Sequence, residues 1–242
     1  MSIKATPLGH SRILSVGTYR PKRAVPNSEI VDRIESTDEW IQQRTGIESR
    51  RFAGDDETVI SMAKAACEMA LKRAKLSIED IDTVILSTIS YPFQAPSAAT
   101  ELINELGNPK AAAFDISAAC AGFCYGVAMG SDLVRSGTSK NVLVIGVEKL
   151  SDYTDPDDRA TAFIFADGAG AVEYGSGSFT PSLVSTWLDK SGFNHHASQS
   201  KTQRQPTLLA AGINNHFAMN FSLFHVFLVE TEDRLLVVAH RK

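Results

Sequence analysis

The chain has 242 residues, of which 43% are apolar and 21% charged, and its formal net charge is −4. This composition is typical of a globular protein that buries a sizeable core. The acidic balance argues against nucleic acid as a partner, because nucleic-acid-binding surfaces are rich in Lys and Arg. No run of 18 apolar residues occurs and the N-terminus has no apolar signal segment. We therefore expect no membrane span and a cytoplasmic protein.

The three cysteines, Cys67, Cys120 and Cys124, are too few and too irregularly spaced for a disulfide framework. Cys120 and Cys124 also lack the C-x-x-C spacing of zinc and redox motifs. We therefore expect free thiols and no metal site.

Between about residues 12 and 175, short β-rich runs alternate with helical stretches. This alternation predicts an α/β fold with a mixed, mostly parallel sheet. In chain order we expect an amphipathic helix at 58–75, a capping box at 77–80, a buried strand at 83–88, a strand at 113–116, a helix at 121–135 and a strand at 142–147. The glycine-rich residues 167–170 look like a tight turn that leads into a strand.

The pattern changes after about residue 175. Residues 198–205 are polar and are expected to form a loop. Residues 214–242 are rich in aromatic and β-branched side chains with a mixed period, so that helix and strand both stay open. We divide the chain into a first unit, residues 1–175, and a second unit, residues 176–242.

Cys120 lies where the expected strand at 113–116 gives way to the expected helix at 121–135. The positive end of a helix dipole favours a thiolate there, and nearby backbone N–H groups could stabilise an oxyanion. The small neighbours, including Ala119 and Gly122, would let a thioester approach closely. On the residues alone, the alternative of an inert core cysteine in an alanine-rich run stays open.

Four segments, in the same order along the chain, resemble β-ketoacyl-acyl-carrier-protein synthase III enzymes. They are the string DISAACAGF at 115–123, similar to the active-site signature, the segment 38–47 followed by Arg50 and Arg51, similar to the coenzyme A-binding segment, and two further blocks at 155–161 and 164–171. The resemblance covers about residues 10–175. It implies the N-terminal half of a thiolase-like fold with layered αβαβα architecture.

The resemblance also implies roles for single residues. Cys120 matches the cysteine that takes the acyl group from acyl-CoA. Trp40 matches the aromatic side chain that stacks on adenine, and Arg44 and Arg159 match residues that hold the nucleotide end of coenzyme A. A flat indole and planar guanidinium groups suit these roles, although a core tryptophan and surface arginines are the alternatives from the residues alone.

Two further residues relate to the acyl group. Phe165 matches a residue of the acyl pocket. Ala95 matches one that reaches across the dimer and limits acyl length, so its small side chain would leave room for a longer or branched starter. The implied reaction needs no cofactor: acyl-CoA acylates Cys120, and malonyl-acyl carrier protein then accepts the acyl group in a decarboxylative condensation that initiates fatty-acid synthesis. The implied assembly is a homodimer.

The family's second half is not recognisable in this sequence. The family completes its site with a histidine in a His-Gln-Ala-Asn-type motif and an asparagine in a Gly-Asn-Thr-Ser-type motif, and neither motif occurs here. Because these groups stabilise the charge that forms when malonyl-acyl carrier protein loses carbon dioxide, we expect an impaired condensation step. No motif supports a substitute base among the remaining candidates, His195, His196, His216, His225 and His240.

Three explanations for the change after residue 175 stay open: a truncated or frameshifted product, a divergent short homologue, and a fragment that needs a partner chain. An incomplete fold would leave an apolar face uncovered, which predicts poor solubility or dimerisation. Two functional hypotheses follow. The first is an acyltransferase that uses Cys120, and the second is a non-catalytic homologue that keeps only coenzyme A binding.

Overall fold

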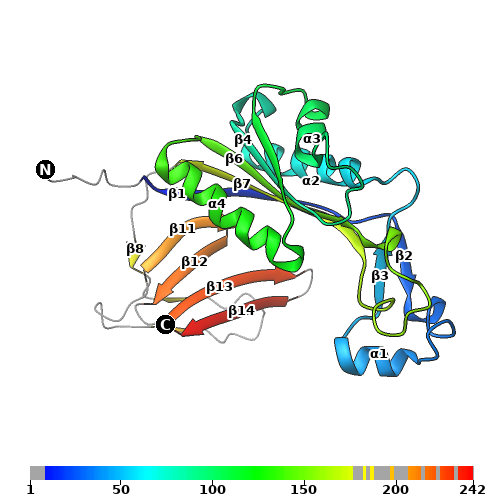
Figure 1. Ribbon diagram of the computed structural model, residues 1–242. Coiled ribbons are helices and arrows are strands. Elements are labelled where there is room, and N and C mark those ends of the chain that lie inside the picture. The colour runs from blue at the N-terminus through cyan, green and yellow to red at the C-terminus, as the bar shows by residue number, and fades with distance from the viewer. Residues whose placement is uncertain are drawn as a thin grey trace, which may run out of the picture.

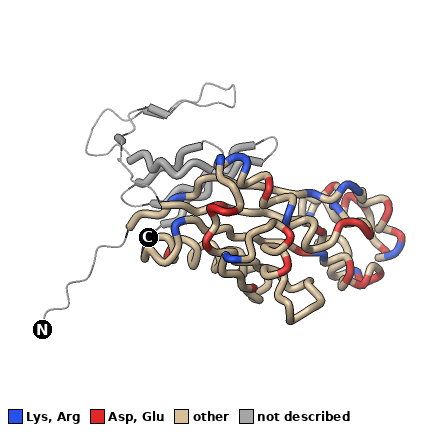
Figure 2. Tube along the Cα trace, turned by 90° about the horizontal axis from the view of Figure 1, so that it is seen from above, with Lys and Arg blue, Asp and Glu red and all other residues tan. Residues whose placement is uncertain are grey.

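The computed structural model describes residues 9–176 with their side chains and, as backbone strands, residues 182–183, 186–187, 197–198, 207–213, 216–221, 224–231 and 234–241. Among these residues no helix is long and apolar enough to cross a membrane. Basic and acidic residues are interspersed over the part of the chain that Figure 2 colours.

A five-stranded mixed sheet forms the centre of the fold (Figure 1). Its strands, in spatial order, are β1 (Ser11–Tyr19), β7 (Asp167–Ser176), β6 (Asn141–Lys149), β4 (Thr83–Ser87) and β5 (Ala112–Ile116). β4 runs parallel to β5 and β6, whereas β7 is antiparallel to β6 and β1. The α/β fold with a mixed sheet is therefore as predicted.

The predicted turn at residues 167–170 is wrong. These residues are the first four of β7, and Asp167 pairs with Lys149 while Gly170 pairs with both Gly146 and Thr18. Strands on both sides supply the pairing that decides the conformation here, so the local turn preference of glycine does not prevail.

Helices cover both faces of the sheet, which gives three layers. α2 (Val59–Ala74) and α3 (Ala98–Leu106) pack on one face, and α4 (Gly122–Ser136) packs on the other. All five residues of β4 are buried because helices lie on both sides of this strand.

The helices begin and end close to where the sequence predicts. The Thr58 side chain accepts a hydrogen bond from the Ser61 N–H at the start of α2, and Lys75 ends this helix with a left-handed φ of 58°. The predicted capping box at Ser77 precedes a short 3-10 helix, η2 (Ile78–Asp80). Gly137, in a left-handed conformation, ends α4.

Two close helix-to-sheet contacts require glycine. A Cβ atom at Gly17 on β1 would lie 2.0 Å from the Ala66 carbonyl oxygen of α2. A Cβ atom at Gly122 would lie 2.1 Å from the Ser87 Oγ at the end of β4. Gly122 thus lets the start of α4 approach the sheet, which is a packing role different from the room for a thioester that the sequence suggests.

A small lobe lies at one end of the molecule (Figure 1). It contains the hairpin β2 (Arg23–Pro26) and β3 (Ser49–Phe52), the turn η1 (Asn27–Glu29) and the helix α1 (Asp38–Thr45). Its separate core consists of Val25, Ile30, Ile34, Ile41, Ala162 and Phe163. Because the last two residues come from the segment before β7, the lobe is tied to the central sheet.

The remaining strands are β8 (Ser182–Leu183), β9 (Thr186–Trp187), β10 (Ala197–Ser198), β11 (Thr207–Ile213), β12 (His216–Phe221), β13 (Phe224–Thr231) and β14 (Arg234–Arg241). β8 and β11 to β14 form a second, antiparallel sheet in the order β14-β13-β12-β11-β8, and β9 pairs with β10. The choice that the sequence leaves open for residues 214–242 is thus decided as strand in the described part. Residues 199–205 of the expected polar loop lie outside the described residues, and the division at residue 175 stays a prediction.

Candidate active site

Cys120 occupies a tight turn between a strand and a helix. β5 ends at Ile116, the chain passes through the 3-10 turn η3 (Ala119–Ala121), and α4 begins at Gly122. Ala119 has a positive φ of 44°, a conformation that costs a non-glycine residue about 1–2 kcal/mol. Cys120 is exposed, whereas the inert cysteine that was the alternative would be buried like Cys67.

A cavity of about 870 Å³ contains Cys120 in its wall. The other walls come from the ends of β4 and β6, the start of β7 and the segment 150–165, which includes Phe165. The carboxyl ends of parallel strands are the usual ligand-binding edge of an α/β sheet. The structure therefore brings together the predicted nucleophile and the predicted acyl-pocket residue.

Glu148, at the end of β6, holds one wall of this cavity. Its carboxylate accepts hydrogen bonds from the Ile89 N–H at 3.0 Å and from the Ser90 hydroxyl at 2.5 Å. The Ser90 Oγ in turn accepts a hydrogen bond from the Lys149 N–H at 2.8 Å. Glu148 thus joins the segment after β4 to β6 and fixes Ile89, which also lines the cavity.

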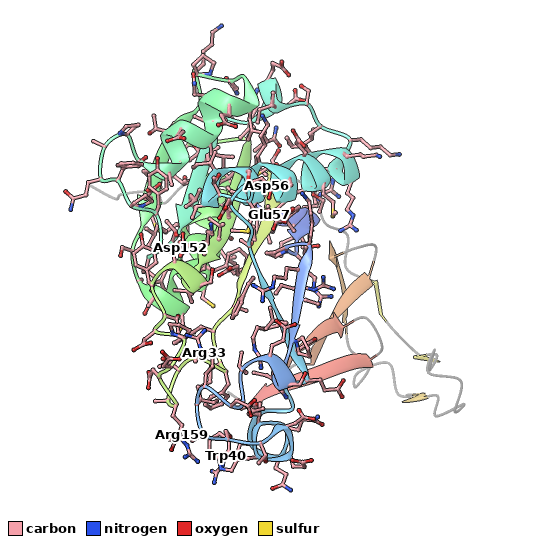
Figure 3. All side chains as sticks on the ribbon, turned by 90° about the vertical axis from the view of Figure 1, so that its right-hand side faces the viewer. Arg33, Trp40, Asp56, Glu57, Asp152 and Arg159 are labelled. Atoms are coloured by element: carbon pink, nitrogen blue, oxygen red, sulfur yellow. The ribbon has the colours of Figure 1, made fainter. Side chains whose placement is uncertain are left out.

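Trp40, Arg44 and Arg159 form a second cluster, which we call the platform. Trp40 and Arg44 lie one turn apart on α1, and the Arg44 guanidinium carbon lies 4.5 Å from the centre of the Trp40 ring. The Arg159 guanidinium carbon approaches the same ring at 5.6 Å. Both distances are in the range of cation–π contacts. Figure 3 shows Trp40 and Arg159 side by side at the end of the small lobe.

One chain segment joins the platform to the cavity. Asp158 and Thr161 line the cavity that contains Cys120, whereas Arg159 reaches the Trp40 ring. The Asp158 carboxylate holds this turn by accepting hydrogen bonds from the Ala160 N–H and the Thr161 hydroxyl. These bonds lower the pKa of Asp158. The turn is thus held by a carboxylate that remains charged at neutral pH.

Comparisons with known proteins show which enzymes the chain is similar to. Residues 114–186 match the family 3-Oxoacyl-[acyl-carrier-protein (ACP)] synthase III. The chain is 53% identical over 169 residues to a β-ketoacyl-[acyl-carrier-protein] synthase III of Kocuria rhizophila, covering 70% of this chain and 48% of the relative. It is 54% identical over 166 residues to a Streptomyces coelicolor enzyme of the same name, covering 69% and 48%.

Solved structures show the same likeness. The priming β-ketosynthase of a polyketide pathway superposes with a TM-score of 0.70 at 40% identity, covering 79% of this chain and 58% of the other. The 3-oxoacyl-[acyl-carrier-protein] synthase III of Aquifex aeolicus superposes with a TM-score of 0.68 at 37% identity, covering 78% and 64%. The chain belongs to the β-ketoacyl-acyl-carrier-protein synthase III family. Its fold is thiolase-like, as the sequence predicts, and the chain spans about half the length of the curated relatives it matches.

The remaining predicted residues of this synthase III homologue lie in three places. Ala95 is exposed in the loop between β4 and α3, and it is not among the residues that line the cavity around Cys120. Of the candidate bases, His216, His225 and His240 lie in β12, β13 and β14. His195 and His196 lie outside the described residues. No cluster of three potential metal ligands occurs among the residues that the structure describes.

Sequence reasoning did not single out the residues that support these clusters. Glu148 and the buried Asn27 are two examples, whereas the sequence places Arg50, with Arg51, in the stretch that resembles the coenzyme A-binding segment but gives it no role of its own. In the sequence, Glu148 directly follows the strand predicted at 142–147, and the end of a strand is the usual position of a site residue in an α/β sheet. Arg50 stands beside Arg51 on a short strand, and the alternation of strand side chains indicates that only one of the two faces solvent.

Proposed function

We propose that this chain is an acyltransferase of the 3-oxoacyl-acyl-carrier-protein synthase III type. The Cys120 thiolate attacks the carbonyl carbon of acyl-CoA, the bond to the coenzyme A sulfur breaks, and coenzyme A leaves as a thiol after taking a proton. Malonyl-acyl carrier protein then loses carbon dioxide, and its carbanion attacks the Cys120 thioester. The products are a 3-oxoacyl-carrier protein, carbon dioxide and the free Cys120 thiolate, and the cycle initiates fatty-acid synthesis without a cofactor.

The observation that carries this proposal is the exposed Cys120 in the wall of a cavity of about 870 Å³. The cavity also contains Phe165, which would contact the acyl group. The segment that lines the cavity leads to Trp40, Arg44 and Arg159, where the adenine and phosphates would bind. The cytoplasm, a homodimeric assembly and a carrier-protein partner belong to the same proposal.

A steady-state assay with acyl-CoA and malonyl-acyl carrier protein tests the whole reaction. Because the His and Asn motifs of the family do not occur in this sequence, we expect carbon dioxide release and a 3-oxoacyl product only at a low rate, and neither in Cys120→Ser. We expect Trp40→Ala to raise the KM for acyl-CoA about tenfold, because stacking on an aromatic ring contributes roughly 1–3 kcal/mol per base. Unchanged product formation in Cys120→Ser would reject the proposed nucleophile.

Ala95 gives the acyl preference its own test. In a homodimer its small side chain would leave space for a longer or branched acyl group at the partner's site. We expect Ala95→Phe to reduce turnover with a branched five-carbon acyl-CoA more than turnover with acetyl-CoA. The exposed neighbour Gln94 offers the control Gln94→Phe. An equal loss with both substrates would show that Ala95 does not limit the acyl chain.

A further inference from the structure

A buried arginine, Arg50, is bonded to residues that support the platform. Arg50 on β3 has only 5% of its surface exposed, and its guanidinium donates hydrogen bonds to three neutral oxygens. They are the Val25 carbonyl at 3.1 Å, the Asn27 Oδ1 at 2.5 Å and the Phe163 carbonyl at 3.3 Å. A buried cation whose acceptors are neutral is expensive to maintain. Its position therefore calls for an explanation beyond the packing of a small core.

One branch of this network fixes α1. Asn27, which is 1% exposed, uses its Oδ1 for Arg50, and its amide donates to the Asp38 Oδ1 at 2.5 Å and to the Ile47 carbonyl at 2.7 Å. Asp38 is the first residue of α1, and Ile47 follows the end of the helix. A single buried amide thus holds both ends of the helix that carries Trp40 and Arg44.

The other branch fixes the segment that carries Arg159. The Phe163 carbonyl accepts from Arg50, and the Phe163 ring lies against Trp40 with 5.3 Å between ring centres and an interplanar angle of 79°. Arg159 lies four residues earlier in the same segment and reaches the Trp40 ring. Arg50 is therefore bonded directly to the segment that carries Arg159 and, through Asn27, to the helix that carries Trp40 and Arg44.

We propose that Arg50 and Asn27 are positioning residues that set the spacing of Trp40, Arg44 and Arg159 and thereby the affinity for the nucleotide end of coenzyme A. This inference rests on the proposed function. Neither residue reaches the platform surface, so their effect passes through α1 and through the Phe163 segment. They are consequently expected to control nucleotide binding and not the chemistry at Cys120.

Two substrates separate these effects. Acyl-CoA uses the platform, whereas the acyl-pantetheine thioester lacks the adenosine 3′,5′-diphosphate and reaches Cys120 without it. In Asn27→Asp, a carboxylate would face Asp38 in place of the donating amide. We expect the KM for acyl-CoA to rise about tenfold or more, because the change removes two hydrogen bonds of the Asn27 amide, one of them to the charged Asp38. The maximal rate and the rate with acyl-pantetheine should stay unchanged.

The double variant Asn27→Asp/Asp38→Asn restores a donor opposite an acceptor between positions 27 and 38, but not the hydrogen bond to the Ile47 carbonyl, and should therefore recover part of the lost affinity. Arg50→Lys is a second route if Asn27→Asp fails to fold, because one ammonium group cannot span the same three acceptors. The matched control is Arg51→Lys, since the guanidinium of Arg51, the next residue on β3, donates to the Pro21 and Lys22 carbonyls instead. We expect no change in KM for this control.

A binding measurement makes the result independent of turnover. The chain has two tryptophans, so that Trp187→Phe leaves Trp40 as the fluorescent reporter. Adenosine 3′,5′-diphosphate should change the Trp40 emission, with a Kd about tenfold weaker in Asn27→Asp and partly recovered in the double variant.

Three outcomes would overturn the positioning role: an unchanged Kd in folded Asn27→Asp or Arg50→Lys, an equal loss with both thioesters, or no nucleotide binding by the unsubstituted platform. Failure of the proposed function looks different. In that case neither thioester acylates Cys120 in the unsubstituted chain, while the nucleotide titration still reports on Arg50 and Asn27.

Discussion

Glu173 is an acidic residue within a run of buried residues on β7. It lies in β7 opposite Ser15 and Leu143, it is fully buried, and both of its carboxylate oxygens lack a hydrogen-bond partner. Burial raises its pKa from 4.5 to about 8. Between pH 4.5 and about 8, the folded protein therefore holds a proton at Glu173 that the unfolded chain has released.

This shift predicts a specific dependence of stability on pH. Between pH 4.5 and about 8 the folded state holds more protons than the unfolded state at Glu173, so its contribution to the free energy of unfolding falls as pH rises. The slope has an upper limit of about 1.4 kcal/mol per pH unit. We expect Glu173→Leu to stabilise the protein more near pH 8 than near pH 5, as measured by urea unfolding.

The exposed Glu68 on α2 supplies the matched control for this experiment. Glu68→Gln should change the free energy of unfolding by less than about 0.5 kcal/mol at either pH. An equal gain from Glu173→Leu at both pH values would show that the carboxyl group is not neutral in the folded protein.

At the scale of helices and strands, the sequence gives no sign of how closely β1 and α2 approach each other. Gly17 looks like an ordinary glycine in a strand, but a Cβ atom there would lie 2.0 Å from the Ala66 carbonyl oxygen and 2.5 Å from the Ala70 nitrogen. Both are backbone atoms of α2, so neither can move without shifting the helix. The packing of α2 against β1 therefore requires that residue 17 has no side chain.

We expect Gly17→Ala to destabilise the protein by about 3 kcal/mol or more, because overpacking against backbone cannot be relieved by a rotamer change. Gly170 on β7 pairs with Thr18, the next residue of β1, and has no neighbouring atom within 4 Å of an added Cβ. Gly170→Ala should therefore cost less than about 1 kcal/mol. Thermal unfolding followed by circular dichroism measures both, and similar losses would contradict the close contact.

At this scale the sequence predicts the elements well where two local signals coincide. Residues 58–75 combine an apolar period with a capping threonine, and α2 follows within one residue at each end. Residues 167–170 carry a turn signal, but strand pairing on both sides overrides it. Arg50 and Arg51 look alike in sequence, and only the tertiary fold places Asn27 and Phe163 around the former.

The residues of the candidate site also differ in whether the sequence can predict them. Motifs predict Cys120, Trp40, Arg44, Arg159 and Phe165, because these are the side chains that contact the substrate in the proposed function. The residues that support the cavity wall, such as Glu148, make their contacts across large sequence separations. No local pattern reports those contacts, so the sequence could not reveal them.

The whole molecule presents a free sheet edge. Among the described strands β5 pairs with β4 alone, and Phe93, in the loop between β4 and α3, has 64% of its surface exposed. Exposed edges and apolar patches of this kind favour association with another chain. The proposed homodimer would cover both.

We expect light scattering to give a dimer for the unsubstituted chain and a monomer for Phe93→Glu. Tyr125 on α4, with 57% of its surface exposed, provides a control of similar exposure on another element. Tyr125→Glu should remain dimeric. A dimer that survives Phe93→Glu would place the contact elsewhere on the chain.

The chain spans about half the length of the curated relatives it matches, yet residues 9–176 hold every side chain that the proposed acyl transfer to Cys120 uses. This first half-reaction is therefore the central claim. Its most direct test is the intact mass of the protein after incubation with acetyl-CoA, compared between Cys120→Ser and Cys124→Ser. The account predicts one acetyl group on the unsubstituted chain, retained in Cys124→Ser and lost in Cys120→Ser. An unmodified protein, or an adduct that persists in Cys120→Ser, would contradict it.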